Sequence, residues 1–440
     1  MSSKKFPGLS ARGGSNVTAV MPKVAAAVAA RSSGSQIDLA SAENWLIRPD
    51  IIEICKDAIA NNLHPIYLSY PRAFAGFPEV LEAFKGFLNK FFNPGIPVEK
   101  EHLATSPGAA SCIDTLLYNI CDPGDGILVP GPYWITSSVI PVSVVTSDLN
   151  SAMSGSLVPA LEAAFENSKI PIRGVLISNP QNPLGQCYAV KVIEECIKFC
   201  QRKDIHYISD KVHGMTSFSC PDFPEPVPFA SALSLDIAGI GCDLSRVHIV
   251  WSTSKDLGQS GMRIGCTITQ GNKEMAVGVT LASHTTTSSL SSICASAILT
   301  SPKLPDVFAK NSELLSTGYS KVVKVLKRHK LRYFPCYSGL YIYAQIAPNC
   351  DTWVEESRLV QRMKNAGVLV SSGRGYHGPE NEKGWARIGF AIPSNELKAA
   401  LGIMDNVFGK EAVLRERDKY MKSLERETQQ LEKSFLETQM

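Results

Sequence analysis

The sequence predicts an α/β protein, in which a large domain with a mainly parallel sheet between helices is followed by a smaller α+β domain. Three observations support this prediction. Short apolar runs alternate with helical stretches between residues 100 and 300, the runs end in turn or polar residues, and the pattern changes near residue 330. With 440 residues, of which 44% are hydrophobic, the chain can bury a large core.

Five apolar runs are the expected strands of the large domain. They are "GILVPGP" (126–132), "VSVVTSD" (142–148), "GVLISNP" (174–180), "HYISD" (206–210) and "VHIVWST" (247–253). Two stretches between them, 161–169 and 189–203, carry apolar residues at helical spacing. This alternation implies βαβ units and a parallel sheet with helices on both faces. Ligands bind beyond the carboxyl ends of strands in such sheets, so the polar residues there are the first candidates for function.

A long helical stretch from Asp306 to His329 leads into the smaller domain. Strands are expected at 339–346, 367–373 and 385–392, with a helix from Trp353 to Asn365. The predicted division of the chain is a flexible N-terminal arm (1–37), a large domain whose N-terminal part joins the small one (38–330), the small C-terminal domain (331–410) and a charged helical tail (411–440). A solvated terminal helix is the expectation for the tail, and a helix that binds a partner is the alternative.

Composition argues against two classes of partner. A net charge of +3 with 19% charged residues leaves no basic surplus for nucleic acid. No apolar run approaches the roughly 18–20 residues that cross a bilayer.

The twelve cysteines form no C-x-x-C pair and predict reduced thiols in a cytoplasmic protein. The first 37 residues lack Asp and Glu, so mitochondrial targeting is a minor alternative to an arm that leads into a short helix from Lys23 to Arg31.

One glycine-rich motif has to be weighed as a dinucleotide fingerprint. The segment "GRGYHG", Gly373 to Gly378, satisfies G-x-G-x-x-G and follows an expected strand. However, it runs into "PENEKG" and not into a helix, so it lacks the helix N-terminus that binds a pyrophosphate. The motif is therefore rejected.

The polar ends of three successive strands carry more information. "SNPQNPLG" (178–185) offers asparagine amides, "SDKVHG" offers Asp210 and then His213, and Lys255 follows the strand "VHIVWST". Taken alone, a carboxylate such as Asp210 at a strand end is often only a helix N-cap. Pyridoxal phosphate (PLP) needs a lysine amine for its aldehyde, a carboxylate for its ring nitrogen, and hydroxyls with an arginine for its phosphate. The three strand ends together meet these needs.

At this point the sequence resembles a known family. "NPQNPLG", "SDKVHG" and "STSKDLGQSGMRIG", in this order, resemble the class I/II PLP-dependent aminotransferases of fold type I. Within that superfamily the chain is most similar to 1-aminocyclopropane-1-carboxylate (ACC) synthase and its relatives, from about Leu39 to Ile392. The resemblance implies the PLP-dependent transferase fold, a small amino-acid substrate and a homodimer with shared active sites.

The resemblance also assigns roles to residues. Those implied for the cofactor are Lys255 for the Schiff base, Asp210 for the ring nitrogen, Asn182 for the phenolate oxygen, Trp134 for stacking on the ring, and Ser252, Ser254 and Arg263 with the backbone of Gly108 and Ala109 for the phosphate. Those implied for the substrate are Arg387 as the clamp of the α-carboxylate, Tyr133 beside it, and Glu43, which is typical of the ACC synthase branch. Tyr70 is similar to the tyrosine that reaches the phosphate of the neighbouring subunit.

The departures from the family pattern bear on the reaction. His213 stands where the family has the tyrosine of Asp-x-x-Tyr, and an Asp-x-x-His version is found in β-C–S lyases of the same fold. Gln259 replaces an apolar residue, Ala109 replaces a threonine, and "RAFA" is inserted beside Tyr70. We expect these changes to leave cofactor binding intact while altering the chemistry.

The sequence therefore leaves several reactions open. A C–S lyase that works by β- or γ-elimination, possible in secondary metabolism, is preferred because of His213. An aminotransferase is nearly as well supported, and cyclisation of S-adenosylmethionine, as in ACC synthase, is a further alternative. A non-enzymatic regulator or scaffold would predict the loss of Lys255, Asp210 or Arg387, and all three are present.

Overall fold

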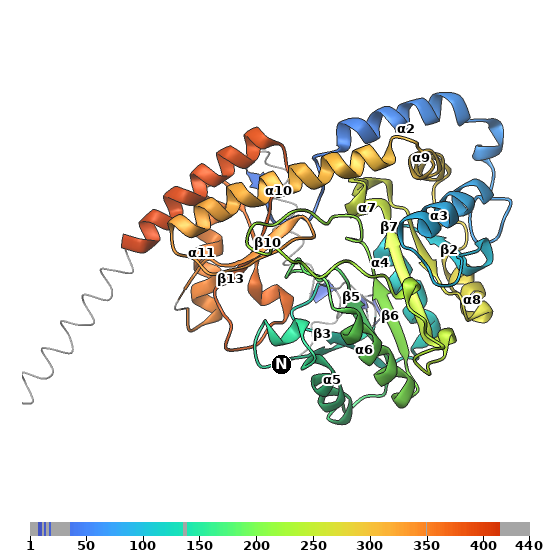
Figure 1. Ribbon diagram of the computed structural model, residues 1–440, viewed down its shortest axis with the longest axis horizontal. Coiled ribbons are helices and arrows are strands. Elements are labelled where there is room, and N and C mark those ends of the chain that lie inside the picture. Colours follow the sequence, from blue (N-terminus) through green and yellow to red (C-terminus); the bar gives the residue numbers. More distant parts are fainter. Residues whose placement is uncertain are drawn as a thin grey trace, which may run out of the picture.

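The computed structural model describes residues 8–10, 13–14, 17–18, 36–134, 139–348 and 350–413. It shows a larger unit around a central sheet and a smaller unit beside it, spanned by one long helix (Figure 1). The short helix expected from Lys23 to Arg31 and the tail beyond residue 413 lie outside the described residues.

A seven-stranded sheet forms the centre of the larger unit. Its strands, in spatial order, are β2 (Leu103–Ser106), β8 (Gly265–Ile268), β7 (Val247–Ser252), β6 (His206–Asp210), β5 (Ile172–Ser178), β3 (Gly126–Pro130) and β4 (Ile140–Val144). The neighbours from β7 to β4 are parallel, and β8 is antiparallel to both β7 and β2. The mainly parallel sheet predicted from the sequence is confirmed.

Helices cover both faces of this sheet (Figure 1). They are α2 (Arg48–Asn62), α3 (Pro78–Phe91), α4 (Ala109–Ile120), α5 (Leu157–Glu166), α6 (Val190–Lys203), α8 (Lys273–Ser283) and α9 (Ser289–Leu299). Alternate strand residues enter different core clusters: Tyr207 belongs to the cluster that contains residues of α3, α5 and α6, and Ile208 belongs to the one that contains residues of α4 and α8. A strand buried on both faces is almost continuously apolar, as β7 is, and this explains why the sequence revealed it so clearly.

The smaller unit contains a four-stranded sheet. Its strands, in spatial order, are β12 (Ser371–Ser372), β13 (Trp385–Gly389), β10 (Tyr341–Gln345) and β9 (Tyr333–Phe334). The helices around it are α10 (Leu304–Arg328), α11 (Trp353–Asn365) and one over residues 394–413. Figure 1 shows α10 running from the larger unit to the smaller one. It begins at Leu304, two residues before the predicted start, because Pro305 is tolerated in the first turn.

The segment that precedes α2 belongs to the smaller unit. Strand β1 (Ile37–Asp38) pairs in parallel with β11 (Val368–Leu369). The chain then follows β13, where the Gly389 N–H donates to the Leu39 carbonyl at 2.7 Å. Residues 39–46 are thereby placed between the small sheet and the carboxyl ends of the large one.

Two further observations concern the glycine-rich motif and possible membrane or metal sites. The motif from Gly373 to Gly378 forms a single 3-10 turn (Gly373–Tyr376) after β12, with no α-helix directly behind it. In the described part of the chain, no helix is long and apolar enough to cross a membrane, and no group of three metal-ligating side chains could hold a metal ion.

Candidate functional site

Lys255 lies at the carboxyl end of β7, in the short helix α7 (Thr253–Asp256). Its Nζ donates a hydrogen bond to the carbonyl oxygen of Ala42, in the segment that comes from the smaller unit. Burial lowers the pKa of this amine to about 8, and the positive charges of Arg387 and Arg263 act in the same direction. A lysine of this kind supplies a neutral, nucleophilic amine far more readily than one on the surface.

Arg387 in β13 faces the same region from the smaller unit. Its side chain is 5% exposed, and its two terminal nitrogens donate to Asn182 Oδ1 at 2.9 Å and to the Ala40 carbonyl at 2.8 Å. The guanidinium carbon lies 4.6 Å from the centre of the Tyr341 ring. Asn182 accepts this hydrogen bond through Oδ1, so the N–H₂ group of Asn182 is not used by Arg387. That N–H₂ group is the donor that a phenolate oxygen would need.

Asp210 ends β6 beside the end of β5. Its Oδ2 accepts from Ser178 Oγ at 3.2 Å, and its Oδ1 accepts from the Val212 N–H at 3.1 Å. Burial raises the pKa of this carboxyl, although both hydrogen bonds and the charges of Lys211 and Lys255 oppose the rise. A cationic ring nitrogen in contact with Asp210 would favour the ionised form further.

His213 is buried near Arg387, on the edge of the Tyr341 ring. It is 2% exposed, and its ring meets the Tyr341 ring edge-on with centroids 5.3 Å apart. Among the described residues, neither His213 Nδ1 nor the Tyr341 hydroxyl has a hydrogen-bond partner. Burial holds the pKa of His213 well below its usual value, and the charges of Lys255 and Arg387 lower it further, so the imidazole is neutral at physiological pH.

The start of α4 provides a cradle for an anion. Gly108 caps the helix with φ of 84°, a conformation that glycine adopts readily, and a Cβ there would lie 2.6 Å from Arg263 Nη2. Ala109 is the first residue of the helix, and the free N–H groups of the first helical turn point out of the N-terminus. The Ser252 hydroxyl is buried and has no partner among the described residues. Ser254, which is also buried, follows two residues later.

Two aromatic residues lie near the end of β3. The Tyr133 hydroxyl is 2.9 Å from Ser143 Oγ, and its ring stacks on His377 with centroids 4.8 Å apart. Trp134 is 52% exposed and lies 6.1 Å from the Tyr376 ring. One small pocket has Tyr133, Trp134, Ser178 and Asn182 among its lining residues, and thus joins residues from two strand ends.

Glu43 reaches this region from the segment before α2. Its Oε2 accepts from Arg48 and its Oε1 from Ser260 Oγ, each at 2.9 Å. Burial alone would raise the pKa of Glu43, but hydrogen bonds from Arg48 and Ser260, with the charges of Arg48 and Lys255, lower it overall. The carboxylate is therefore engaged with the loop that follows Lys255.

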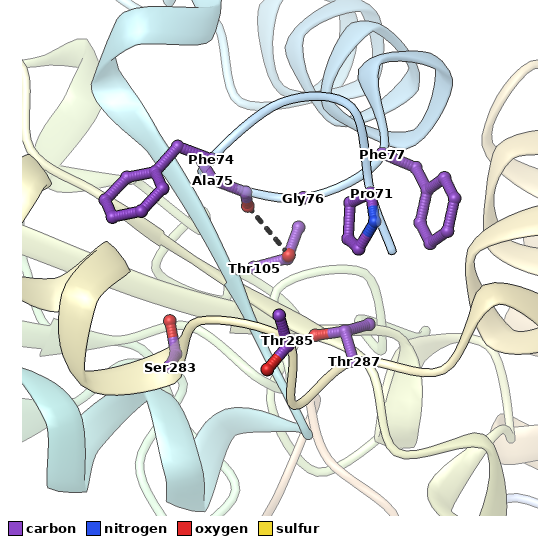
Figure 2. Close-up of a pocket in the computed structure, with 9 residues that line it drawn as sticks. All are labelled: Pro71, Phe74, Ala75, Gly76, Phe77, Thr105, Ser283, Thr285 and Thr287. Atoms are coloured by element: carbon purple, nitrogen blue, oxygen red, sulfur yellow. Dashed lines mark hydrogen bonds between the residues drawn. The ribbon is translucent and has the colours of Figure 1, made fainter. Parts of the chain in front are cut away.

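Tyr70 does not contact these site residues within the described part of the chain. It is 80% exposed, in the loop that leads to α3. Figure 2 shows how the inserted residues after it are held: Thr105 Oγ1 donates to the Ala75 carbonyl at 2.9 Å, and Phe74 projects to one side. The Phe74 ring packs against the His284 ring in a tilted arrangement, with centroids 4.7 Å apart. Since Thr105 belongs to β2, the loop is fixed to the strand that leads into Gly108.

Sequence reasoning missed several residues of this region. Tyr341 was seen only as part of an expected strand, and Tyr376 only as part of a rejected motif. Both pack against the Arg387 guanidinium, with ring centres at 4.6 and 5.3 Å. Alternation along β10 places Tyr341 and Tyr343 on one face, but it does not tell which face meets the arginine.

The residues present fit PLP. The fit rests on a buried amine of lowered pKa at Lys255, an unpartnered buried hydroxyl at Ser252, and a glycine cradle at Gly108 closed by Arg263. Asp210 and Asn182 stand at neighbouring strand ends, where a ring nitrogen and a phenolate oxygen could be bound.

Comparisons with known proteins agree with this fit. The family model described as "Aminotransferase class I and II" matches residues 36–403. "Probable aminotransferase aclI" of Aspergillus oryzae is 49% identical over 414 residues, which cover 92% of this chain and 99% of that protein. "Aminotransferase verI" of Clonostachys rogersoniana is 34% identical, covering 86% and 87%, and "1-aminocyclopropane-1-carboxylate synthase 6" of Arabidopsis thaliana is 26% identical, covering 79% and 71%.

A solved structure supports the fold independently. Aspartate aminotransferase from Thermus thermophilus with maleate superposes with a TM-score of 0.72 at 20% identity, over 91% of this chain and all of that chain. A likeness at this identity bears on the fold alone. Because the family model covers most of the chain and the residues that PLP requires are present, the protein belongs to the class I and II aminotransferase family of PLP-dependent enzymes.

Proposed function

We propose that the protein cleaves a carbon–sulfur bond in an L-amino-acid conjugate by β- or γ-elimination, with PLP attached to Lys255. The observation that carries the proposal is His213. It occupies the position of the family's tyrosine in an Asp-x-x-His motif. It is buried and neutral, and its Nδ1 has no hydrogen-bond partner in the described part of the chain. A neutral imidazole three residues after Asp210 would give the cofactor surroundings different from those of a phenol.

The chain's own residues would act in a defined order. Arg387 would bind the substrate α-carboxylate through both terminal nitrogens, in place of Asn182 and the Ala40 carbonyl. The amine of Lys255, neutral above a pKa of about 8, would remove the proton from Cα. PLP, when bound, supplies an electron sink for the electron pair left on Cα, and Asp210 would hold its ring nitrogen. In the lyase reaction the C–S bond then breaks and a thiolate leaves.

An aminotransferase is the second candidate. Support for it comes from the names of the relatives, since aclI, verI and several others are called aminotransferases. The same Lys255, Asp210 and Arg387 would serve that reaction, in which the amino group passes to a keto acid. The two reactions share every residue that binds the cofactor and differ in their products.

The products decide between the two candidates. The purified enzyme is incubated with S-conjugates of L-cysteine, with S-adenosylmethionine and with common L-amino acids, with and without an added keto acid. The lyase proposal predicts a free thiol, pyruvate and ammonia from a cysteine conjugate with no keto acid present, and no thiol from the Lys255→Ala variant. Amino transfer that depends on the keto acid, without thiol, would refute it. His213→Tyr is the matched variant and should lower the ratio of elimination to transfer.

We also propose a cytoplasmic homodimer. All twelve cysteines are free thiols, as expected of a reducing compartment. The proposed role of Tyr70 at the partner's phosphate is supported by its 80% exposure and by the anchoring of its loop on β2, next to the chain's own anion cradle.

A further inference from the structure

A loop of the smaller unit connects β12 to β13 and reaches across to the larger unit. This loop, called the strap here, comprises residues 372–384 and includes the glycine-rich motif from Gly373 to Gly378. It begins directly beside the arginine of the site, because strand pairing places Ser371 opposite Arg387. The proposed reaction gives the strap no role, although it meets both parts of the site.

The middle of the strap packs on Arg387 and on the end of β3. The Tyr133 N–H donates to the Tyr376 carbonyl at 2.7 Å, and the His377 ring stacks on the Tyr133 ring. Tyr376 is fully buried. Its ring centre lies 5.3 Å from the Arg387 guanidinium carbon and 6.1 Å from the Trp134 ring centre. Tyr376 is therefore next to the proposed clamp of the substrate and next to the side chain proposed to stack on PLP.

One buried carboxylate holds both ends of the strap. Glu356 lies in α11 and is 0% exposed. Its Oε1 accepts from Ser372 Oγ at 2.5 Å and from the Arg374 N–H at 2.8 Å, and its Oε2 accepts from the Gly384 N–H at 2.9 Å. Only the backbone of Arg374 takes part, since its guanidinium carbon lies over the Trp353 ring.

The bonding of Glu356 is directed at the strap alone. Its three donors all belong to the strap, and in the part of the chain that the structure describes Glu356 forms no ion pair. A buried carboxylate is costly unless donors satisfy both of its oxygens. Removing it would leave two backbone N–H groups and one hydroxyl without their acceptor, at the two points where the strap is fixed.

We propose that Glu356 is a positioning residue for substrate binding, which fixes both ends of the strap and so holds Tyr376 against Arg387. The strap, seated on the end of β3, in turn keeps the guanidinium in a fixed place relative to Lys255. None of the groups bonded to Glu356 belongs to the proposed PLP site, so its removal affects the affinity for the amino acid and not that for the cofactor. The inference rests on the role proposed above for Arg387.

The test compares two dissociation constants, both measured by absorbance titration. The first is that of 2-aminoisobutyrate on the PLP-loaded protein; this probe carries an amine and an α-carboxylate but no Cα hydrogen for Lys255 to remove. The second is that of PLP on the apoprotein. Glu356→Ala should bind the probe about three- to thirtyfold more weakly and bind PLP as the wild type does. Glu356→Gln keeps one acceptor oxygen for Ser372 and Arg374 but none for Gly384, so its loss should be smaller.

Control variants separate this inference from the proposal it rests on. Glu396→Ala, at an exposed glutamate of the smaller unit, should bind both ligands as the wild type does. Full probe affinity in folded Glu356→Ala, or equal weakening of the probe and PLP, would overturn the positioning role. Arg387→Lys should weaken the probe and spare PLP; if it does not, the assignment of Arg387 as the clamp fails instead.

A measurement on the wild type keeps the test valid if Glu356→Ala does not fold. Coupling between two sites is reciprocal, so a strap that favours binding of the probe must itself be stabilised by the probe. Saturation with 2-aminoisobutyrate should therefore slow hydrogen exchange at the N–H groups of Arg374 and Gly384, which bond to Glu356. Unchanged exchange at both positions in the saturated protein would overturn the inference.

Discussion

Burial and two neighbouring arginines lower the pKa of Lys255 and so favour its neutral, reactive amine. Its pKa of about 8 predicts that the apoprotein captures PLP at a rate that rises with pH, with its midpoint near pH 8 and not near the usual lysine value of 10.5. The reason is that only the neutral amine attacks the aldehyde. Stopped-flow absorbance at a series of pH values measures this profile.

A variant tests the cause of the shift. Arg387→Met removes the second largest contribution to the lowered pKa of Lys255, so the midpoint of the profile should move upward. A midpoint that stays in place in this variant, or a wild-type rate that still rises above pH 9.5, would contradict the account of Lys255.

Arg387 is expected to recognise the substrate and not the cofactor. Arg387→Lys loses the planar pair of donors, so the KM for an amino-acid substrate should rise roughly 10- to 150-fold, corresponding to about 1.5–3 kcal/mol. Affinity for PLP should change little. Arg374→Lys is the matched control, since Arg374 is exposed and lies outside the site. Steady-state kinetics with an unchanged KM in Arg387→Lys would rule out the clamp.

At the scale of the elements, a histidine pair links the amino ends of the central strands. His248 in β7 is buried, with Nε2 at 2.9 Å from His206 Nδ1 in β6 and Nδ1 at 3.1 Å from Thr269 Oγ1. Burial lowers the pKa of His248 to about 3, and the charge of His206 adds to this. The unfolded chain therefore binds a proton between about pH 6.5 and 3 that the folded chain does not.

This difference makes stability depend on pH. The contribution of a neutral His248 is complete above about pH 6.5 and falls as the pH drops toward 3, by up to about 1.4 kcal/mol per pH unit. His248→Gln should flatten the decline of the unfolding free energy in that window, as measured by urea denaturation between pH 6.5 and 4.5. His64→Gln, at an exposed histidine, serves as control and should leave the slope unchanged. An equal slope in wild type and His248→Gln would refute the prediction.

The sequence predicted the longer strands of the central sheet and missed two short ones. Strands such as β5 and β7 are continuous apolar runs, so they were found with small errors at their ends. Strands β2 and β8 have only four residues each, and their antiparallel pairing at the sheet edge has no distinctive pattern.

The same limit applies to the candidate site. Lys255, Asp210 and Asn182 could be found because each follows a recognisable strand. Tyr341 could not, because its importance depends on which face of its strand meets Arg387. That information is tertiary, and one sequence does not contain it.

At the scale of the whole molecule, the site is assembled from both units. Residues 39–46 and β13 bring Arg387 and Glu43 from the smaller unit to strand ends of the larger one. A site built in this way can also accept a residue from a second chain, and Tyr70 is the proposed one. Its exposed position in an anchored loop is suited to such a contact.

Mixing two damaged chains tests this sharing. If Tyr70 serves the partner's site, then a hybrid of Lys255→Ala and Tyr70→Ala chains has one site with both changes and one with neither. Random reassortment should restore activity at about a quarter of the sites. A mixture of Lys255→Ala with Arg387→Ala should restore nothing, because both residues belong to one chain's site. Activity no higher than the mean of the two parent variants would exclude the role of Tyr70.

The most direct test of the whole account is to find the lysine that carries PLP. The loaded protein is reduced with borohydride, digested, and its peptides are sequenced by mass spectrometry. We expect a phosphopyridoxyl group on Lys255 and loss of the label in Lys255→Ala. A label on another lysine, or no label at all in the wild type, would contradict the assignment.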